Sequence, residues 1–260
     1  MKRYNRWAAL FLMALGITAF ASSCNKKLDI VASNLGSEKL EWQSISDTRA
    51  HLMGIYGLMR AALVDNYGHW IYGEMRYGDF TPYSRADLRV VQENKLRSAY
   101  PLLKDLTDWR RFYAVINAAS LFIERAPEVM AKDKRYTERD MKFDVAQART
   151  IRALMYFYMV RIWGDVPLLK DSYDNGSFTE LARSTEATVL AFAETELLAA
   201  AQDLPYRYAF GTQTYYGESY GTWVGVLVNK ITAYSLLAHV AAWQGKYINA
   251  EVYSRFVIDN

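Results

Sequence analysis

Cysteine, proline and glycine are scarce in this chain of 260 residues, which holds 1, 5 and 14 of them. A single cysteine excludes an internal disulfide framework and any zinc site built from several cysteines. The few prolines and glycines, with apolar residues at helical spacing through most of the chain, argue against an all-β sandwich or barrel. With 52% hydrophobic and 23% charged residues, the chain is expected to fold around a sizeable core.

Nucleotide-binding motifs are also missing. The sequence has no phosphate-binding Walker loop and no dinucleotide-binding glycine pattern. None of the three histidines has a second metal-ligand type four residues further on; they are His51, His69 and His239. The sequence therefore predicts no catalytic residue, no metal site and no cofactor.

Two pairs of carboxylates lie four residues apart on predicted helices. They are Glu124 with Glu128, and Asp140 with Asp144. Such pairs among lysines and arginines are typical of a solvated helix face, so both are expected to face water. Nothing in their spacing places two of them around a glycosidic bond.

The N-terminus has the layout of an export signal. A basic start is followed by the apolar stretch Trp7 to Phe20, which is shorter than the ~20 residues of a spanning helix. Ala21-Ser22-Ser23-Cys24 then resembles the lipobox of bacterial lipoproteins, although Ala21 stands where leucine is usual. This resemblance implies a signal peptide over residues 1–23 and an acylated Cys24. Residues 24–45 are expected to form a tether, and ordinary signal cleavage that leaves a free thiol is the alternative.

The apparent basic charge belongs to that signal. The whole chain has 31 Lys plus Arg against 28 Asp plus Glu, and three of the basic residues lie within residues 1–23, which hold no acidic residue. The mature chain is therefore expected to be neutral overall. Global charge gives no reason to expect nucleic acid as a partner, and membrane attachment would come from acyl chains on Cys24.

The mature chain shows the period of amphipathic helices in several stretches. The first is expected to begin at a Ser46-Asp47 cap, the second to stop before Pro127, and the third to be opened by Thr137 with Asp140 and closed by Gly164. Residues 67–101 show no sustained period and are expected to be rich in loops. The predicted helices cover residues 46–64, 109–126, 137–163, 184–204 and 224–244, and a further one begins near residue 248.

The junction Gly245-Lys246-Tyr247-Ile248-Asn249-Ala250 has the spacing of a tetratricopeptide repeat. Gly245 would make the tight turn, Tyr247 would pack back on the preceding helix, and Ala250 would allow close helix approach. The predicted fold is all-α, a tetratricopeptide-like array of helix pairs with long aromatic loops. An ordinary helical hairpin with a glycine turn is the alternative at this junction.

The stretch RALMYFYMVRIWGDVPLL, residues 152–169, resembles the central signature of the RagB/SusD family of nutrient-binding outer-membrane lipoproteins. Residues 230–250 resemble the family's lysine-led small-residue helix, with local departures at Ser235 and His239. Residues 109–125 resemble the helix before the signature, with the family asparagine at Asn117. The resemblance implies a SusD-like fold. Because family members are much longer, residues 46–260 are expected to form an N-terminal part truncated at its C-terminus.

The resemblance also implies a function. A SusD-like protein would bind a nutrient, with a glycan as the expected one, without catalysing a reaction on it. It would do so at the cell outer membrane and deliver the nutrient to a SusC-like TonB-dependent transporter. A peptide is the alternative cargo. A tetratricopeptide scaffold for protein partners is the alternative from another class, and an enzyme is the third.

Two aromatic segments are candidates for contact with a ligand or a partner. In the first, residues 67–80, flat rings that suit the apolar faces of a sugar alternate with charged groups that suit its hydroxyls; packing of these rings onto the helices is the alternative. The second, residues 206–223, is expected to expose its rings to a ligand or a partner protein. The candidates of the first segment are Trp70, Tyr72, Glu74, Arg76, Tyr77 and Asp79, and those of the second are Tyr215, Tyr216, Tyr220 and Trp223.

Overall fold

The computed structural model describes residues 41–97, 99–173, 180–209 and 211–260. The predicted signal peptide and Cys24 lie outside these residues. One compact unit extends from Trp42 to Asn260. Its longer helices are α2 (Ile45–Val64), α6 (Arg110–Lys132), α7 (Glu138–Trp163), α8 (Glu186–Asp203), α9 (Lys230–Trp243) and α10 (Tyr247–Ile258).

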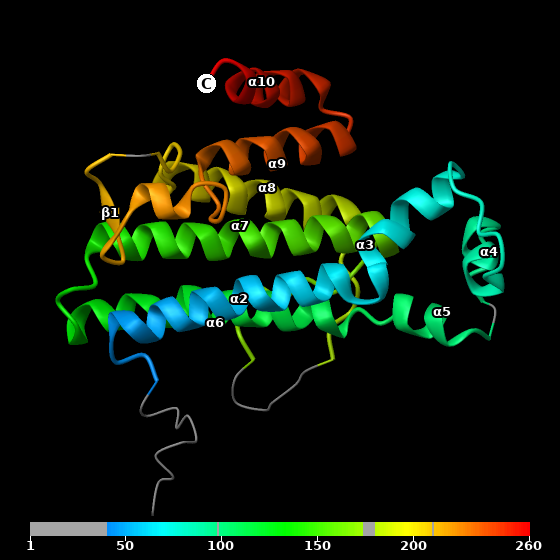
Figure 1. Cartoon of the computed structure of the whole chain (residues 1–260), viewed down its shortest axis with the longest axis horizontal. Helices are drawn as coiled ribbons and strands as arrows, with labels where there is room; N and C mark the ends of the chain where they lie inside the picture. Colours follow the sequence, from blue (N-terminus) through cyan, green and yellow to red (C-terminus); the bar gives the residue numbers. More distant parts are fainter. Residues whose placement is uncertain (1–40, 98, 174–179, 210) are drawn as a thin grey trace, which may run out of the picture. The chain divides into compact units, whose positions relative to one another are not determined.

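The helices are arranged as a stack in chain order. α6 packs on α2 and α7, α7 packs on α8, and α9 packs on α8 and α10 (Figure 1). The prediction of an all-α array of helix pairs is confirmed, because each helix buries its apolar face mainly against its neighbours in sequence. In the part of the chain that the structure describes, the paired strands are β1 (Thr214–Tyr215) and β2 (Glu218–Ser219).

The compact unit begins earlier than the predicted domain start at residue 46. Trp42 is buried, and its ring stacks on His51 at a centroid distance of 4.0 Å. The helix cap lies at Ser44, two residues before the predicted Ser46. Ser44 and Asp47 form a full capping box, in which the Ser44 side chain accepts from the Asp47 amide and the Asp47 side chain accepts from the Ser44 amide at 2.8 Å. The last residues of the expected tether therefore belong to the folded body.

α6 continues through Pro127, which corrects the prediction that it stops before that residue. Ala126 and Val129 on either side are fully buried, whereas Pro127 is on the exposed side. Burial of the flanking apolar residues favours continuation of the helix over the local preference of the residue before proline. Tertiary packing thus overrides the local signal.

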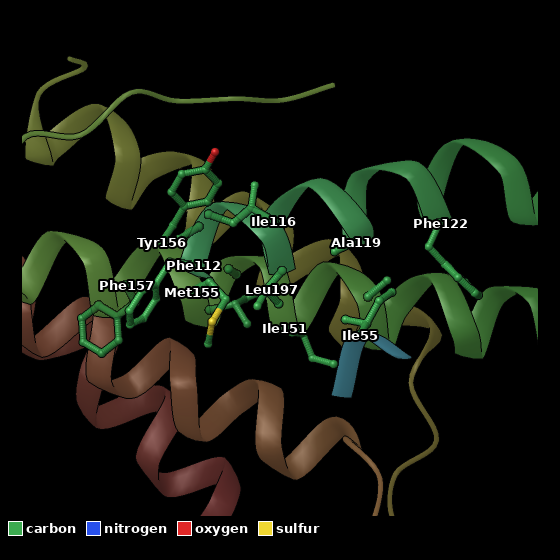
Figure 2. Packing of buried hydrophobic residues seen from close by; sticks show 14 of the residues in the cluster. Ile55, Phe112, Ile116, Ala119, Phe122, Ile151, Met155, Tyr156, Phe157 and Leu197 are labelled. Atoms are coloured by element: carbon green, nitrogen blue, oxygen red, sulfur yellow. The ribbon is translucent and has the colours of Figure 1, made fainter. Parts of the chain in front are cut away.

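α7 is the central helix of the stack, as its apolar composition predicts. Thr137 caps it by accepting from the Asp140 amide, as expected, and Gly164 ends it with φ 69° and ψ −123°. Side chains from α6 and α7 converge with Ile55 of α2 and Leu197 of α8 in one core (Figure 2). The core residues labelled there from α6 and α7 are Phe112, Ile116, Ala119, Phe122, Ile151, Met155, Tyr156 and Phe157.

The α9–α10 junction follows the predicted turn in part. Gly245 has φ 72°, a conformation that glycine adopts without strain. Tyr234 of α9 stacks on Phe256 of α10 at 3.8 Å between ring centroids. Tyr247, by contrast, is 75% exposed, so the prediction that it packs back on α9 is wrong. Ring contacts further along the pair hold the two helices together instead.

Residues 65–106 are more helical than their sequence predicts. This segment contains η1 (Asp65–Tyr67), α3 (Gly68–Trp70), the π-helical η2 (Ile71–Met75), α4 (Ala86–Gln92) and α5 (Pro101–Leu106). η2, α4 and α5 form there because each brings apolar side chains to a small common cluster. Its buried members are Ile71, Met75, Val91, Leu103 and Leu106.

Candidate ligand-binding site

The first aromatic segment holds its rings in two different environments. Tyr72 is a packing residue: its hydroxyl donates to the Leu106 carbonyl at 2.7 Å, and its ring meets Trp163 edge-on at 5.8 Å. Burial raises the pKa of the Tyr72 hydroxyl above its ordinary value. The hydroxyl is therefore committed to fastening η2 onto α5.

The other candidates of this segment reach the surface. Trp70 is half-buried and packs edge-to-face on Phe80, with 5.0 Å between ring centroids. Tyr77 is 79% exposed, and Gly78 beside it turns the chain with φ 104°. The chain thus turns between the exposed Tyr77 and Phe80, which packs on Trp70.

Charged groups flank these rings. Glu74, Arg76 and Asp79 are all exposed, and the Arg76 guanidinium donates to the Asn94 side-chain oxygen at 3.1 Å. The Gln92 amide donates to the Phe80 carbonyl at 3.0 Å, which ties the turn to α4. The segment therefore presents rings and charges on backbone that the neighbouring helices hold in place.

Tyr83 is an exposed ring that the sequence analysis missed. Its side chain is 94% exposed, and the Arg89 guanidinium donates to its carbonyl at 3.4 Å. The only available signal was its position three residues after Phe80, just beyond the segment judged aromatic. It extends the surface that Tyr77 and Phe80 begin along the chain.

The second aromatic segment is packed inward, which corrects the expectation that its rings are exposed. Tyr215, Tyr220 and Trp223 are buried, and Tyr216 is half-buried. A tight hairpin turn at Tyr216 and Gly217, with φ 54° and 79°, aims these rings at α2 and α7. The Trp223 indole donates to the Tyr215 carbonyl at 3.2 Å, so the hairpin is closed by its own aromatics.

Asp144 is the point on which the hairpin is anchored. Its carboxylate accepts hydrogen bonds from three tyrosine hydroxyls: Tyr136 at 2.7 Å, Tyr216 at 2.5 Å, and Tyr215. Asp144 is fully buried, and Asp140 is buried beside Arg139. The prediction that these two carboxylates face water is wrong.

Burial sets the ionisation of Asp144. Removal from water raises the pKa of this carboxyl to about 7, and the three hydroxyl donors oppose the rise without cancelling it. The charge of nearby Asp140 acts in the same direction as burial. The cluster is thus a buried polar anchor whose protonation changes near neutral pH.

A second set of hydrogen bonds extends the anchor to α2. The Tyr56 hydroxyl donates to Gln147 at 2.8 Å and accepts from the Val228 amide at 2.9 Å, and the Gln147 amide donates to the Tyr215 hydroxyl at 3.0 Å. The buried polar groups satisfy one another, which is what allows them to lie in the core. The hairpin segment is therefore structural in this unit.

The signature stretch also has a structural role. Arg152 donates to Glu196 of α8 at 2.5 Å, to the Ser120 hydroxyl of α6 at 2.8 Å and to the Lys170 carbonyl at 3.0 Å. The Tyr156 hydroxyl bonds both backbone groups of Leu169. These residue types are needed because the extended chain after Gly164 has backbone groups to satisfy inside the core.

The other carboxylate pair and His51 have partners of their own. Glu124 accepts from the backbone amide and the hydroxyl of Ser172, and Glu128 pairs with Arg125. His51 stacks on Trp42, and His239 lines an open recess between α9 and α10.

Among the described residues, no three His, Cys, Asp or Glu side chains gather closely enough to hold a metal ion. None of the helices in the described ranges is long and apolar enough to cross a bilayer.

Comparison with known proteins identifies the family. The profile of the SusD-like family described as "Starch-binding associating with outer membrane" matches residues 43–241. The chain belongs to the SusD-like family. The resemblance carried by residues 152–169 is thereby confirmed, and the helix array is the SusD-like fold.

Solved structures agree with this assignment. A SusD superfamily protein from Bacteroides thetaiotaomicron is 56% identical, with a TM-score of 0.81 over 84% of this SusD-like chain and 48% of that protein. A laminarin-binding SusD-like protein is 19% identical, with a TM-score of 0.65 over 83% of this chain and 43% of that protein. The second likeness concerns the fold alone.

Curated relatives are more distant in sequence. The SusD-like protein P38 of Formosa agariphila is 25% identical over 170 residues, which are 65% of this chain and 31% of that protein. A SusD-like protein of Bacteroides ovatus is 39% identical over 64 residues, 25% of this chain and 11% of that protein. The chain spans about a third of the length of P38 and about half of the solved Bacteroides thetaiotaomicron relative.

Proposed function

We propose that this chain is the N-terminal part of a non-enzymatic outer-membrane lipoprotein that binds a glycan and delivers it to a SusC-like TonB-dependent transporter. The family description, starch binding in association with the outer membrane, supports the ligand class and the location. A relative named as laminarin-binding shares the fold and supports a glucan as the first probe.

The observation that carries the proposal is the surface of residues 70–83. Tyr77, Phe80 and Tyr83 are exposed rings, and the half-buried Trp70 packs edge-to-face on Phe80. Arg76 and Asp79 are exposed within the same turn. Rings provide stacking surfaces for sugar rings, while the carboxylate and guanidinium bond hydroxyls, so recognition needs no covalent step.

The direct test is isothermal titration of the purified chain with laminarin oligosaccharides, starch oligosaccharides and a mixed tryptic peptide pool. Tyr77→Ala combined with Asp79→Asn is expected to weaken glycan binding at least about tenfold, the equivalent of about 1.4 kcal/mol. Tyr247→Ala is the matched control, because Tyr247 is equally exposed but lies on α10.

Three results would contradict the proposal. Glycan binding that survives the double substitution would remove the site from this segment. Peptide binding without glycan binding would change the cargo. Hydrolysis of a bound glycan by the purified chain would contradict the non-enzymatic role.

Cys24 is proposed to carry the lipid anchor. Conversion of Cys24 to serine is expected to move the protein from the membrane fraction to the soluble fraction and to abolish incorporation of labelled palmitate. Wild-type protein that stays soluble and unlabelled in a host with lipoprotein processing would contradict the anchor.

The proposed transporter partnership concerns the complete protein, because this chain spans 48% of the solved Bacteroides thetaiotaomicron relative. In the proposed complete protein, further helices would cover the exposed apolar side chains of α10, among them Ile248 and Val252. Affinity purification of the native protein from outer membranes is expected to recover a TonB-dependent barrel. Recovery of unrelated protein complexes instead would favour the tetratricopeptide scaffold.

A further inference from the structure

A recess of about 300 Å³ lies where the start of α6 meets the extended chain that follows α7. It is separate from the residues of the proposed aromatic site. Apolar and aromatic groups form most of its wall, with one arginine among them. The lining residues are Trp109, Arg110, Tyr113, Pro167, Leu169 and Leu181.

Two hydrogen bonds hold the wall of the recess in one shape. The Tyr113 hydroxyl donates to the Pro167 carbonyl at 2.7 Å, and the Tyr156 hydroxyl donates to the Leu169 carbonyl at 2.7 Å. Both tyrosines project from helices of the core, so the wall formed by Pro167 and Leu169 is fixed before any ligand arrives. Fixed walls reduce the entropy lost on binding.

A second arginine, Arg183, lies beside the recess on the ring of one of its lining residues, Trp109. The Arg183 guanidinium lies 5.1 Å above the ring of Trp109, and its charge also reaches the Tyr113 hydroxyl. Arg110 is already neutralised by Asp108, at 2.5 Å. Arg183 makes no ion pair with the described part of the chain, and the described residues that line the recess include no carboxylate.

We propose that this recess binds an acidic sugar unit of the glycan, one that carries a carboxylate or a sulfate. The inference rests on the proposed glycan-binding function and narrows its ligand class. The anionic group pairs with the Arg183 guanidinium, which offers two parallel donors to such oxygens. The apolar face of the sugar ring packs on Pro167 and Leu181, and Trp109 keeps the guanidinium in position from below.

The test compares three tetrasaccharides of matched length by titration of the purified chain: tetragalacturonate, a sulfated carrageenan tetrasaccharide and neutral laminaritetraose. The parent is expected to bind at least one acidic probe more tightly than the neutral one. Arg183→Gln is expected to weaken the acidic probe about tenfold or more and to leave laminaritetraose unchanged. Arg207→Gln is the matched control. It removes the same charge from an exposed arginine that lies in the segment before the hairpin.

A second variant guards against misfolding at position 183. Leu181→Asp adds a negative charge at a side chain that is already 44% exposed, and it is expected to weaken the acidic probes while circular dichroism stays unchanged. Binding of the carboxylated probe alone, or of the sulfated probe alone, supports the inference and identifies the anion.

Failure of this inference and failure of the proposed aromatic site give different results. If the acidic probes bind equally to the parent, Arg183→Gln and Leu181→Asp, the proposed binding at the recess is wrong. The aromatic site stands in that case if Tyr77→Ala still weakens binding of these probes. If Arg183→Gln weakens binding of the acidic probes and Tyr77→Ala does not, the result supports binding at the recess and contradicts the aromatic site. No binding of any probe overturns both.

Discussion

The hydroxyl of Tyr156 donates to the carbonyl of Leu169 at 2.7 Å and accepts from the amide of the same residue at 2.8 Å. One side chain of α7 thus satisfies both backbone groups of a buried residue in the extended chain that returns along it. This pairing explains why the signature stretch contains a tyrosine at position 156. It also explains why the wall of the recess formed by Leu169 is rigid. Its removal is the most direct way to test the structural role of the signature.

Tyr156→Phe is expected to lower the free energy of unfolding by about 1–3 kcal/mol, because the amide and carbonyl of Leu169 lose their partner inside the core. Urea unfolding followed by circular dichroism measures the change. Tyr158→Phe is the control in the same helix turn, because Tyr158 is only half-buried and no hydrogen bond of its hydroxyl is found among the described residues. Equal effects of the two substitutions would contradict the assignment.

The buried pair of Arg152 and Glu196 gives a second prediction. Arg152→Met is expected to cost about 3–5 kcal/mol, since Glu196 would be left in the core with only the partly exposed Arg149 as partner. Adding Glu196→Leu to that variant is expected to recover part of the loss. Arg255→Met breaks an exposed pair on α10 and should change stability little. A double variant less stable than Arg152→Met alone would argue against this account.

Asp144 predicts an unusual dependence of stability on pH. Burial raises the pKa of its carboxyl from an unfolded value of 3.8 to about 7 in the folded chain. Between these values the folded state binds more protons than the unfolded state, so this group makes the free energy of unfolding fall as pH rises from about 4 to about 7. Asp144→Asn cannot titrate and should lose this contribution.

The measurement for Asp144 is a series of urea unfolding curves across that pH range for the parent and Asp144→Asn. The stability of the parent relative to the variant is expected to decrease with pH and to level off above neutrality. A relative stability that increases with pH would mean that the three tyrosine hydroxyls outweigh burial and depress the pKa of the carboxyl.

Two glycines form a matched pair for a backbone prediction. Gly164 ends α7 with φ 69° and ψ −123°, a conformation strained for any other residue, whereas Gly54 lies exposed inside α2 with no atom within 4 Å of an added methyl group. Gly164→Ala is expected to cost about 1–3 kcal/mol, and Gly54→Ala to stabilise by up to about 1 kcal/mol. Thermal unfolding of both variants tests the contrast, and a stabilising Gly164→Ala would refute it.

Several local features were predictable because neighbours in sequence determine them. The Thr137 cap, the Gly164 and Gly245 turns and the apolar period of α2 and α7 each depend on residues within one or two helical turns. The continuation of α6 through Pro127 was not predictable in this way, because it depends on what Ala126 and Val129 pack against. The short helices of residues 65–106 likewise depend on contacts among segments that are distant in the chain.

The candidate sites, too, were predictable only where neighbours in sequence determine them. The spacing of rings and charges in residues 67–80 led to Tyr77 and Asp79, which are exposed, but it could not show that Tyr72 is committed to Leu106. The recess at Trp109 could not be found from sequence, since Trp109 and Arg183 meet only after the chain has passed along α6 and α7 and turned back.

The helical period, the main turns and, through residues 152–169, the family follow from the amino-acid sequence alone. That Asp144 and Tyr215 are core residues follows from tertiary packing, because a carboxylate four residues from another and a tyrosine-rich loop both suggest a solvated surface. The physical reason is that spacing along a helix specifies which side chains share a face. Whether water or another segment covers that face depends on distant parts of the chain. Tyr215, which covers Asp144, lies 71 residues further along the sequence.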